Sequence, residues 1–332
     1  MKRSFFLYIS LFLLIFISLF AISCKMPSGI SQISDSLEEA VSLSDNDVPV
    51  ADSSTSPAVE KGARDSAAVC LIPSADGTVT YGNNLVTIDA SHTKEGYVMV
   101  KYNGSVSKVK LQITGPDQTT YTYDLNQQFQ VFPFASGSGR YDIAAYENIA
   151  GTQYSTTFQK TIDVSIENEF HPFLYPNQYV NFSQDSAVVK LGEELASSAG
   201  SDLDVVSNIY NYMINNITYD YDKASTVTSG YLPDPDSVLL SKKGICFDYA
   251  AVMASMLRSQ RIPTRLEIGY AGEAYHAWIS TYIKDVGWVN GIIEFDGKNW
   301  KLMDPTFASN TSERELKKFI GDGSNYHTKY MY

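Results

Sequence analysis

The hydrophobic pattern of this 332-residue chain changes its period near residue 168, and this change limits the folds open to it. From about residue 70 to that point, apolar and polar residues alternate, as in strands with one buried face. Beyond it, apolar residues recur first at helical spacing and then alternate again. The two periods place side chains on different faces, so the two parts need different architectures. We therefore expect an α+β unit preceded by an all-β unit.

Residues 70–168 are predicted to form the all-β unit. The alternation is clearest in two runs, whose apolar faces carry Val109, Leu111 and Ile113, and Ile162, Val164 and Ile166. Turn residues recur at Asn103-Gly104, Gly115-Pro116-Asp117, Gly137-Ser138-Gly139 and Ala150-Gly151. About seven short strands at this spacing favour a β-sandwich of immunoglobulin-like type. No catalytic constellation is visible in it, so we expect a spacer or a binding module.

Residues 169–332 are predicted to form the α+β unit. Helical spacing marks two helices, through Val188, Leu191 and Leu195 and then through Val206, Ile209, Tyr210 and Met213. The stretch YLPDPDSVLL has the chemistry of a loop. A further helix is expected from Cys246 to about Gln260, because Pro263 cannot continue it. Four strand-like runs follow, RLEIGY, YHAWISTY, WVNGIIEF and NWKLMD, and predict an antiparallel sheet after the helices.

Residues 1–24 resemble an export signal. Lys2 and Arg3 precede an almost uninterrupted apolar run over residues 4–21, and small residues lead into Cys24. The ending AISC resembles a bacterial lipobox, with Ala where Leu is usual, and predicts lipidation of Cys24. A signal anchor and simple secretion are the alternatives, since the apolar run is nearly long enough to span a bilayer. All three place the rest of the chain outside the cytoplasm.

Residues 25–69 are expected to be a disordered tether between the lipid and the folded units. The segment is rich in Ser, Asp, Ala and Pro and contains no aromatic residue. Such a composition cannot bury enough apolar surface to fold by itself.

Charge and cysteine content narrow the function. A formal net charge of −12 argues against a broad basic surface for nucleic acid. Apart from Cys24, the chain has only Cys70 and Cys246, and no Cys/His spacing suits a metal, so we expect neither a metal site nor a cofactor. In an oxidising compartment the two cysteines could pair, so the surroundings of Cys246 must decide its role.

Cys246 is the first candidate for chemistry because it stands at the start of a predicted helix. Unpaired backbone N–H groups and the helix dipole favour an anion there and lower the pKa of a thiol. Gly244, two residues earlier, is expected to leave space for a substrate. The alternative is a small, buried and unreactive cysteine.

His276 and Asp304 complete a chemically consistent set with Cys246. His276 lies in YHAWISTY, where period two puts Trp278 on its face. Asp304 ends an apolar run, and a buried carboxylate there needs a partner such as a histidine on a neighbouring strand. Each alone also fits a structural role, as a strand histidine or an Asp-Pro turn. Together, the thiolate attacks an acyl carbon, the imidazole protonates the leaving amine and the carboxylate orients the ring.

Residues 205–307 resemble the transglutaminase-like superfamily, which has a papain-like fold. The resemblance rests on the order Cys, His, Asp and on the stretches IYNYMINNITYDYD, GICFDYAAVMASMLRSQRIPTRLEIGY, YHAWISTYI and WKLMDPTF. It implies that Cys246, His276 and Asp304 are the catalytic triad. Bacterial members are similar to cysteine proteases and amidases at least as often as to protein cross-linkers. The calcium sites of eukaryotic cross-linkers have no matching pattern here.

The oxyanion hole is only partly assigned by the sequence. The backbone N–H of Cys246 is one expected donor. An upstream side chain is expected to supply another, and the candidates are Tyr219, Tyr221, Asn215 and Asn216. Full cross-linkers use a Trp for this purpose, whereas this chain has no Trp before Trp278, which puts transamidation in more doubt than hydrolysis.

Two functional interpretations follow from these features. The first is an extracytoplasmic thiol enzyme, lipid-anchored to a bacterial membrane, that cleaves or transfers peptide or side-chain amides through a thioester. Its partners are then a peptide or protein substrate and, through the N-terminal lipid, the membrane. The second is a surface-anchored binding protein in which the β-sandwich acts and the transglutaminase-like domain is idle.

Overall fold

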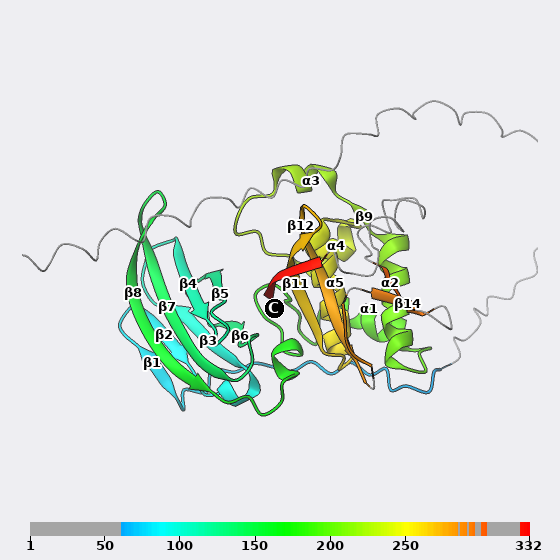
Figure 1. The fold of residues 1–332 in the computed structure, drawn as a ribbon, viewed down its shortest axis with the longest axis horizontal. Helices are drawn as coiled ribbons and strands as arrows, with labels where there is room; N and C mark the ends of the chain where they lie inside the picture. The colour runs from blue at the N-terminus through cyan, green and yellow to red at the C-terminus, as the bar shows by residue number, and fades with distance from the viewer. Residues whose placement is uncertain (1–60, 285, 291, 296–299, 304–325) are drawn as a thin grey trace, which may run out of the picture.

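The computed structural model describes residues 61–284, 286–290, 292–295, 300–303 and 326–332. The predictions for the signal, for lipidation of Cys24, for most of the tether and for Asp304 concern residues outside this described part. None of the helices in the described part is long and apolar enough to cross a membrane. Figure 1 shows an all-β unit beside an α+β unit, in the chain order that the sequence predicts.

The first unit consists of two four-stranded antiparallel sheets that share an apolar core (Figure 1). One sheet has the order β1 (Thr80–Gly82), β2 (Val86–Asp89), β3 (Tyr97–Tyr102) and β6 (Gln130–Pro133). The other has the order β5 (Thr120–Asp124), β4 (Val109–Thr114), β7 (Gly139–Ala150) and β8 (Gln153–Val164). Val109, Leu111 and Ile113 of β4 are buried, which confirms the alternation expected from the sequence.

The second unit combines helices with a four-stranded antiparallel sheet. Its helices are α1 (Ala187–Ala196), α2 (Asp202–Asn216), α3 (Tyr221–Thr226), α4 (Pro235–Ser241) and α5 (Cys246–Ser259). The sheet has the order β13 (Gly287–Asn290), β12 (Ala274–Ile283), β11 (Thr264–Ala271) and β16 (Tyr326–Met331). Two short ladders pair β9 (Thr218–Tyr219) with β10 (Lys243–Gly244) and β14 (Ile292–Phe295) with β15 (Trp300–Met303).

The second half of YLPDPDSVLL forms helix α4, although its composition predicts a loop. Asp234 caps this helix by accepting a hydrogen bond from the Ser237 N–H. Pro235 occupies the first helical position, where its missing N–H is not needed and its fixed φ suits the helix. The Asp-Pro pair is therefore a helix start, a signal that outweighs the turn propensity of the same residues.

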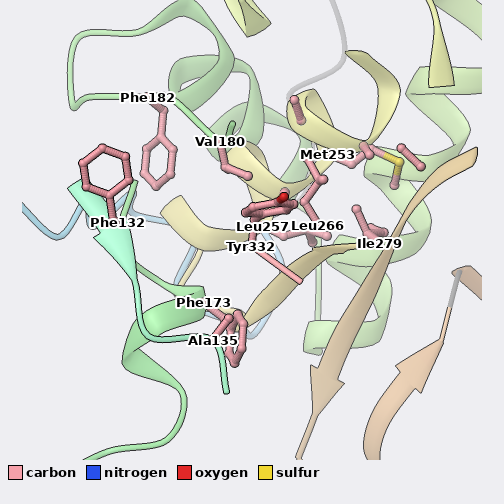
Figure 2. Packing of buried hydrophobic residues seen from close by; sticks show 14 of the residues in the cluster. Phe132, Ala135, Phe173, Val180, Phe182, Met253, Leu257, Leu266, Ile279 and Tyr332 are labelled. Carbon is pink, nitrogen blue, oxygen red and sulfur yellow. The ribbon is translucent and has the colours of Figure 1, made fainter. Parts of the chain in front are cut away.

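Helix α5 lies at the centre of the second unit. All of its residues except Phe247 are buried, and it packs against α1, α2, α4, β11 and β12. Figure 2 shows Met253 and Leu257 of α5 beside Leu266 of β11 and Ile279 of β12. A helix enclosed on all sides cannot shift without disturbing a close-packed core, so the position of its first residue is well defined.

The two units share a continuous apolar core, because buried residues of both belong to a single cluster. In Figure 2, Phe132 of β6 lies beside Phe182, which precedes α1. The ring of Tyr332 packs edge-on against Tyr121 and Tyr123 of β5, at centroid distances of 5.5 and 5.9 Å. Aromatic contacts therefore join the units, in addition to the chain that connects them.

Residues 61–69, at the end of the predicted tether, are bound to the second unit. The Val69 N–H donates to the Ser259 carbonyl at 2.8 Å. Arg64 Nε lies 2.6 Å from Asp202 Oδ1. These bonds hold an ordered segment, so the folded part of the chain begins before residue 70.

Candidate active site

Cys246 is the first residue of α5, as the sequence predicts. Ile245 before it is extended, with φ −93° and ψ 175°, so the chain passes from extended to helical at the cysteine. The preceding strand β10 pairs in parallel with β9, and Gly244 lies opposite Tyr219. Cys246 is only 5% exposed. Its thiol therefore lies at a largely buried helix N-terminus, where backbone N–H groups converge.

His276 lies on β12, opposite Gly269 of β11, and is also 5% exposed. Its ring stacks beside that of Trp278, with centroids 6.2 Å apart, so the two share a face as period two predicts. Tyr326 of β16 packs edge-on against Trp278 at 5.0 Å. β16 can come this close because position 269 is a glycine, where a Cβ would lie 2.0 Å from the backbone oxygen of His327.

Cys246 and His276 lie on elements that pack together. Helix α5 contacts β12, and both residues stand near the beginning of their elements. Burial raises the pKa of Tyr275, the neighbour of His276, and nearby tyrosines and the charge of Cys246 raise it further.

Asp304, the third predicted triad residue, lies outside the described residues. Strand β15 ends at Met303, which pairs with Ile292 of β14. β14 in turn contacts β12, the strand of His276. The role of Asp304 therefore stays a prediction.

Asp248, in the first turn of α5, is a buried residue that the sequence analysis does not single out. Its side chain is fully buried, and Oδ2 accepts a hydrogen bond from the Ile245 N–H at 2.9 Å. Oδ2 also lies 2.7 Å from Lys223 Nζ of α3, while Tyr231 donates its hydroxyl proton to Oδ1. The sequence signal for this role is an acidic residue three positions after the N-cap, because its carboxylate can accept a hydrogen bond from the N-cap N–H.

Asp248 also changes the explanation for Gly244. A Cβ at position 244 would lie 2.7 Å from the Asp248 Cβ, closer than real Cβ contacts. The space beside Gly244 is thus filled by Asp248, not kept for a substrate. The glycine is needed so that the carboxylate can cap the turn before Cys246.

Comparison with known proteins identifies the domain that carries these residues. Residues 189–291 match the family model of the transglutaminase-like superfamily. This domain belongs to that superfamily. The matched range includes Cys246 and His276 and ends before Asp304. The transglutaminase-like domain therefore occupies most of the second unit.

Individual relatives are distant. The UPF0252 protein MJ1282 of Methanocaldococcus jannaschii is 30% identical over 96 residues, 25% of this chain and 27% of that protein, so the match spans about a quarter of the relative. A candidate cysteine protease from Cytophaga hutchinsonii has 18% identity and a TM-score of 0.32, covering 64% of this chain and 67% of that chain. The periplasmic domain of TgpA from Pseudomonas aeruginosa has 14% identity and a TM-score of 0.32, covering 69% of this chain and 95% of that one.

The four oxyanion candidates of the transglutaminase-like domain differ in their exposure and in how they pair with the turn before Cys246. Tyr219 is half-buried and lies opposite Gly244 in the β9–β10 pair. Its ring is 5.0 Å from that of Tyr221, which begins α3 and is 55% exposed. Asn215 and Asn216 are exposed at the end of α2, and their amides donate to carbonyls one turn earlier, at 2.8 Å each. The parallel pair therefore holds Tyr219 beside the turn that leads to Cys246.

Cys70 is half-buried just before the first strand of the all-β unit. Burial raises the pKa of its thiol, which keeps it protonated and poorly nucleophilic at neutral pH. No disulfide joins Cys70 to Cys246 in the part of the chain that the structure describes. Within that same part, no three His, Cys, Asp or Glu side chains gather in a way that could hold a metal ion.

The all-β unit contains a separate cluster of polar side chains around His92. This His92 cluster comprises Ser74, Asp76, His92 and Glu95. His92 Nε2 lies 2.8 Å from Asp76 Oδ2 and 3.0 Å from Ser74 Oγ, and Nδ1 lies 3.0 Å from Glu95 Oε1. Burial opposes a charge on His92, but the hydrogen bonds to Glu95 and Asp76 outweigh it and raise the pKa of His92. Both ring nitrogens of His92 therefore have partners within the cluster, Nε2 with Asp76 and Ser74 and Nδ1 with Glu95.

Proposed function

We propose that the chain is a thiol enzyme that cleaves or transfers peptide or side-chain amides through a thioester on Cys246. The supporting observation is the position of Cys246, at the buried N-terminus of α5, packed against the strand of His276. Backbone N–H groups and the helix dipole at that position favour the thiolate, the form that attacks an acyl carbon. A cysteine with a packing role alone needs neither feature.

The reaction begins when the Cys246 sulfur bonds to the amide carbon and the carbonyl electrons move to the oxygen. The Cys246 N–H and the Tyr219 hydroxyl are the donors that we assign to this oxyanion. The imidazolium of His276 then gives its proton to the amide nitrogen, the C–N bond breaks and the amine leaves. Asp304 orients the imidazole through the other ring nitrogen and takes no proton itself.

The second half-reaction decides between hydrolysis and transfer. Water or an amine attacks the thioester carbon, His276 accepts the proton of that nucleophile, and the C–S bond breaks to restore the thiolate. Both outcomes use the same residues, so the access of water or amine to the thioester sets the product. The lack of a tryptophan before Trp278 supports hydrolysis as the main outcome.

We also propose that the enzyme works outside the cytoplasm, anchored to a bacterial membrane by a lipid on Cys24. The support is the positively charged start, the apolar run over residues 4–21 and the AISC ending. Mass spectrometry of the mature N-terminus should find an acylated Cys24, and an intact Met1 would contradict this. We place the all-β unit among immunoglobulin-like sandwiches because of its two facing antiparallel sheets.

The test of the proposed function is capture of the thioester. The full chain is incubated with a library of short peptides that present backbone, Gln and Asn amides, and intact-protein mass spectrometry looks for an acyl adduct that hydroxylamine removes. Wild type and Cys70→Ser should both form the adduct, because Cys70 takes no part in the chemistry. Cys246→Ala should form none, and His276→Ala should form very little, because it lacks the proton donor.

The competing interpretation is a surface-anchored binding protein with an idle transglutaminase-like domain. It predicts no adduct from any amide and a Cys246 that alkylates with the pH dependence of an ordinary thiol. It also predicts that peptides or glycans bind the all-β unit equally well in wild type and in Cys246→Ala.

A further inference from the structure

The first turn of α5 holds two groups that can carry negative charge. Cys246 is the first helical residue, and the fully buried carboxylate of Asp248 stands two residues later. The positive end of the helix dipole stabilises either anion, so the two compete for the same potential. A buried carboxylate this close also repels a thiolate, because like charges disfavour ionisation. Something must offset Asp248 if Cys246 is to react as a thiolate.

The offsetting charge in the structure belongs to Lys223. Its Nζ lies 2.7 Å from Asp248 Oδ2, and its side chain is 28% exposed whereas that of Asp248 is fully buried. Nζ also lies 4.3 Å from the ring centroid of Tyr231, whose hydroxyl is bound to Asp248 Oδ1. Burial raises the pKa of Tyr231, as does its hydrogen bond to Asp248, so Tyr231 adds a neutral donor. Among these partners, Lys223 is the one that brings a positive charge.

Helix α3 holds Lys223 in place from outside α5. The Asp220 carboxylate caps α3 by accepting a hydrogen bond from the Lys223 N–H at 2.9 Å. The Asp220 N–H in turn donates to the Gly244 carbonyl at 2.9 Å, directly before the nucleophile turn. α3 is thus tied, through the backbone of its N-cap Asp220 and through the Lys223 side chain, to Gly244 and Asp248, which lie two residues before and two residues after Cys246. This connection gives α3 a role that its short length and surface position do not suggest.

We propose that Lys223 is a positioning residue that lets Asp248 cap the turn before Cys246 without suppressing the thiolate. Asp248 supplies the geometry, because it fixes the Ile245 N–H. Lys223 supplies the compensating charge. The idea rests on the proposed function, since it concerns the reactivity of the same thiol.

The experiment measures the alkylation rate of Cys246 by iodoacetamide between pH 5 and 10 in the full chain. Trypsin releases Cys246 in a peptide of residues 244–258 and Cys70 in a peptide of residues 65–94, so mass spectrometry follows each thiol separately. Cys70 is the internal control in every variant. Thermal unfolding of each variant confirms that it is folded.

The charge variants should move the apparent pKa of the Cys246 thiol in opposite directions. Lys223→Met leaves the carboxylate uncompensated and should raise it by about one pH unit, the order expected for one charge at roughly 10 Å in a partly buried site. At pH values below the pKa of the wild-type thiol, the alkylation rate should then fall about tenfold. Asp248→Asn keeps an oxygen to cap Ile245 but leaves the lysine charge, and should lower the thiol pKa. The double variant should return towards wild type, and Lys223→Arg should stay near it.

The other titratable side chains around this turn are the same in the Lys223 and Asp248 variants. Tyr231 and Asp234 lie in and beside the loop before α4, and Tyr275 and His276 lie on β12. Tyr231→Phe is the matched control, because it removes a hydrogen bond to Asp248 without changing a charge. Its effect on the thiol pKa should be much smaller than that of Lys223→Met.

The outcomes separate the two ideas. Shifts of Lys223→Met and Asp248→Asn in the same direction, or no shift in either, would overturn the role of Lys223 while leaving a low wild-type thiol pKa and the proposed function intact. A wild-type Cys246 that titrates like a free thiol would count against the proposed function. In that case, opposite shifts in the two variants would still establish the charge compensation.

Discussion

Replacing Arg258 with methionine tests how firmly helix α5 is held at the end opposite Cys246. Arg258 lies in the last turn of α5 and is 1% exposed. Its guanidinium donates to three backbone carbonyls, of Thr264 at 2.9 Å, Tyr175 at 2.6 Å and Tyr332 at 2.6 Å. Burial lowers the pKa of Arg258 to about 9, still above neutral pH, so the side chain remains charged.

The size of the effect follows from these contacts. Each hydrogen bond from a charged donor contributes about 1.5–3 kcal/mol, and part of the loss is regained because methionine has no charge to bury. We expect Arg258→Met to lower the free energy of unfolding by about 4 kcal/mol. For a chain of this size, the melting temperature should fall by about 10 °C. Arg258→Lys keeps the charge but makes fewer hydrogen bonds, so its melting temperature should lie between those of the wild type and Arg258→Met.

The assay is thermal unfolding followed by circular dichroism, with Arg261→Met as the matched control. Arg261 also donates to backbone carbonyls, of Ala67 and Asp65, but its side chain is 36% exposed. Solvent screens these contacts, and we expect a loss of less than about 1 kcal/mol. If Arg258→Met melts within about 3 °C of Arg261→Met, the three carbonyl bonds do not hold the helix as inferred.

Three further predictions concern single side chains. In urea unfolding, Gly244→Ala should destabilise the fold by about 1–3 kcal/mol, because the new Cβ would meet Asp248. Gly200→Ala is the control and should have little effect, because its Cβ would meet only a side-chain oxygen at 3.4 Å. Tyr219→Phe should lower kcat about a hundredfold on a peptide amide, with little change in KM. A change in KM alone would show that Tyr219 is not an oxyanion donor. Because the pKa of His92 is raised in the folded protein, its charged form stabilises the fold below about pH 6.5, and this stabilisation is lost as the pH rises through the raised pKa. The free energy of unfolding of the wild type should therefore fall by roughly 0.5–1 kcal/mol by pH 8, whereas that of His92→Gln should not change for this reason. Equal pH profiles of the two proteins would contradict this.

The local elements of the fold could be predicted from the sequence because their signals are local. The alternation through Val109 and Ile113 predicts a strand, and β4 covers it. The start of a helix at Cys246 and its end before Pro263 follow from the apolar spacing and from the missing proline N–H, and α5 runs from Cys246 to Ser259. The candidates Cys246 and His276 emerged in the same way, since each stands at a recognisable place in a helix or strand.

Contacts between distant segments could not be predicted in this way. β16 was not expected, because its six residues look like a polar tail until they pair with β11. The bond between Lys223 and Asp248 joins two helices whose relative position no local pattern specifies. The helix start of α4 was missed because Asp and Pro favour turns and helix N-termini alike.

The amino-acid sequence by itself determined the order of an all-β unit and an α+β unit, the superfamily of the second, and the places of Cys246 at a helix start and His276 in a strand. Only the tertiary structure decided that α5 is enclosed on all sides and that the two units share one core. It also decided that the buried carboxylate of Asp248 meets a lysine from another helix. Periodicity and capping act over a few residues, whereas burial and charge compensation depend on which surfaces meet in space.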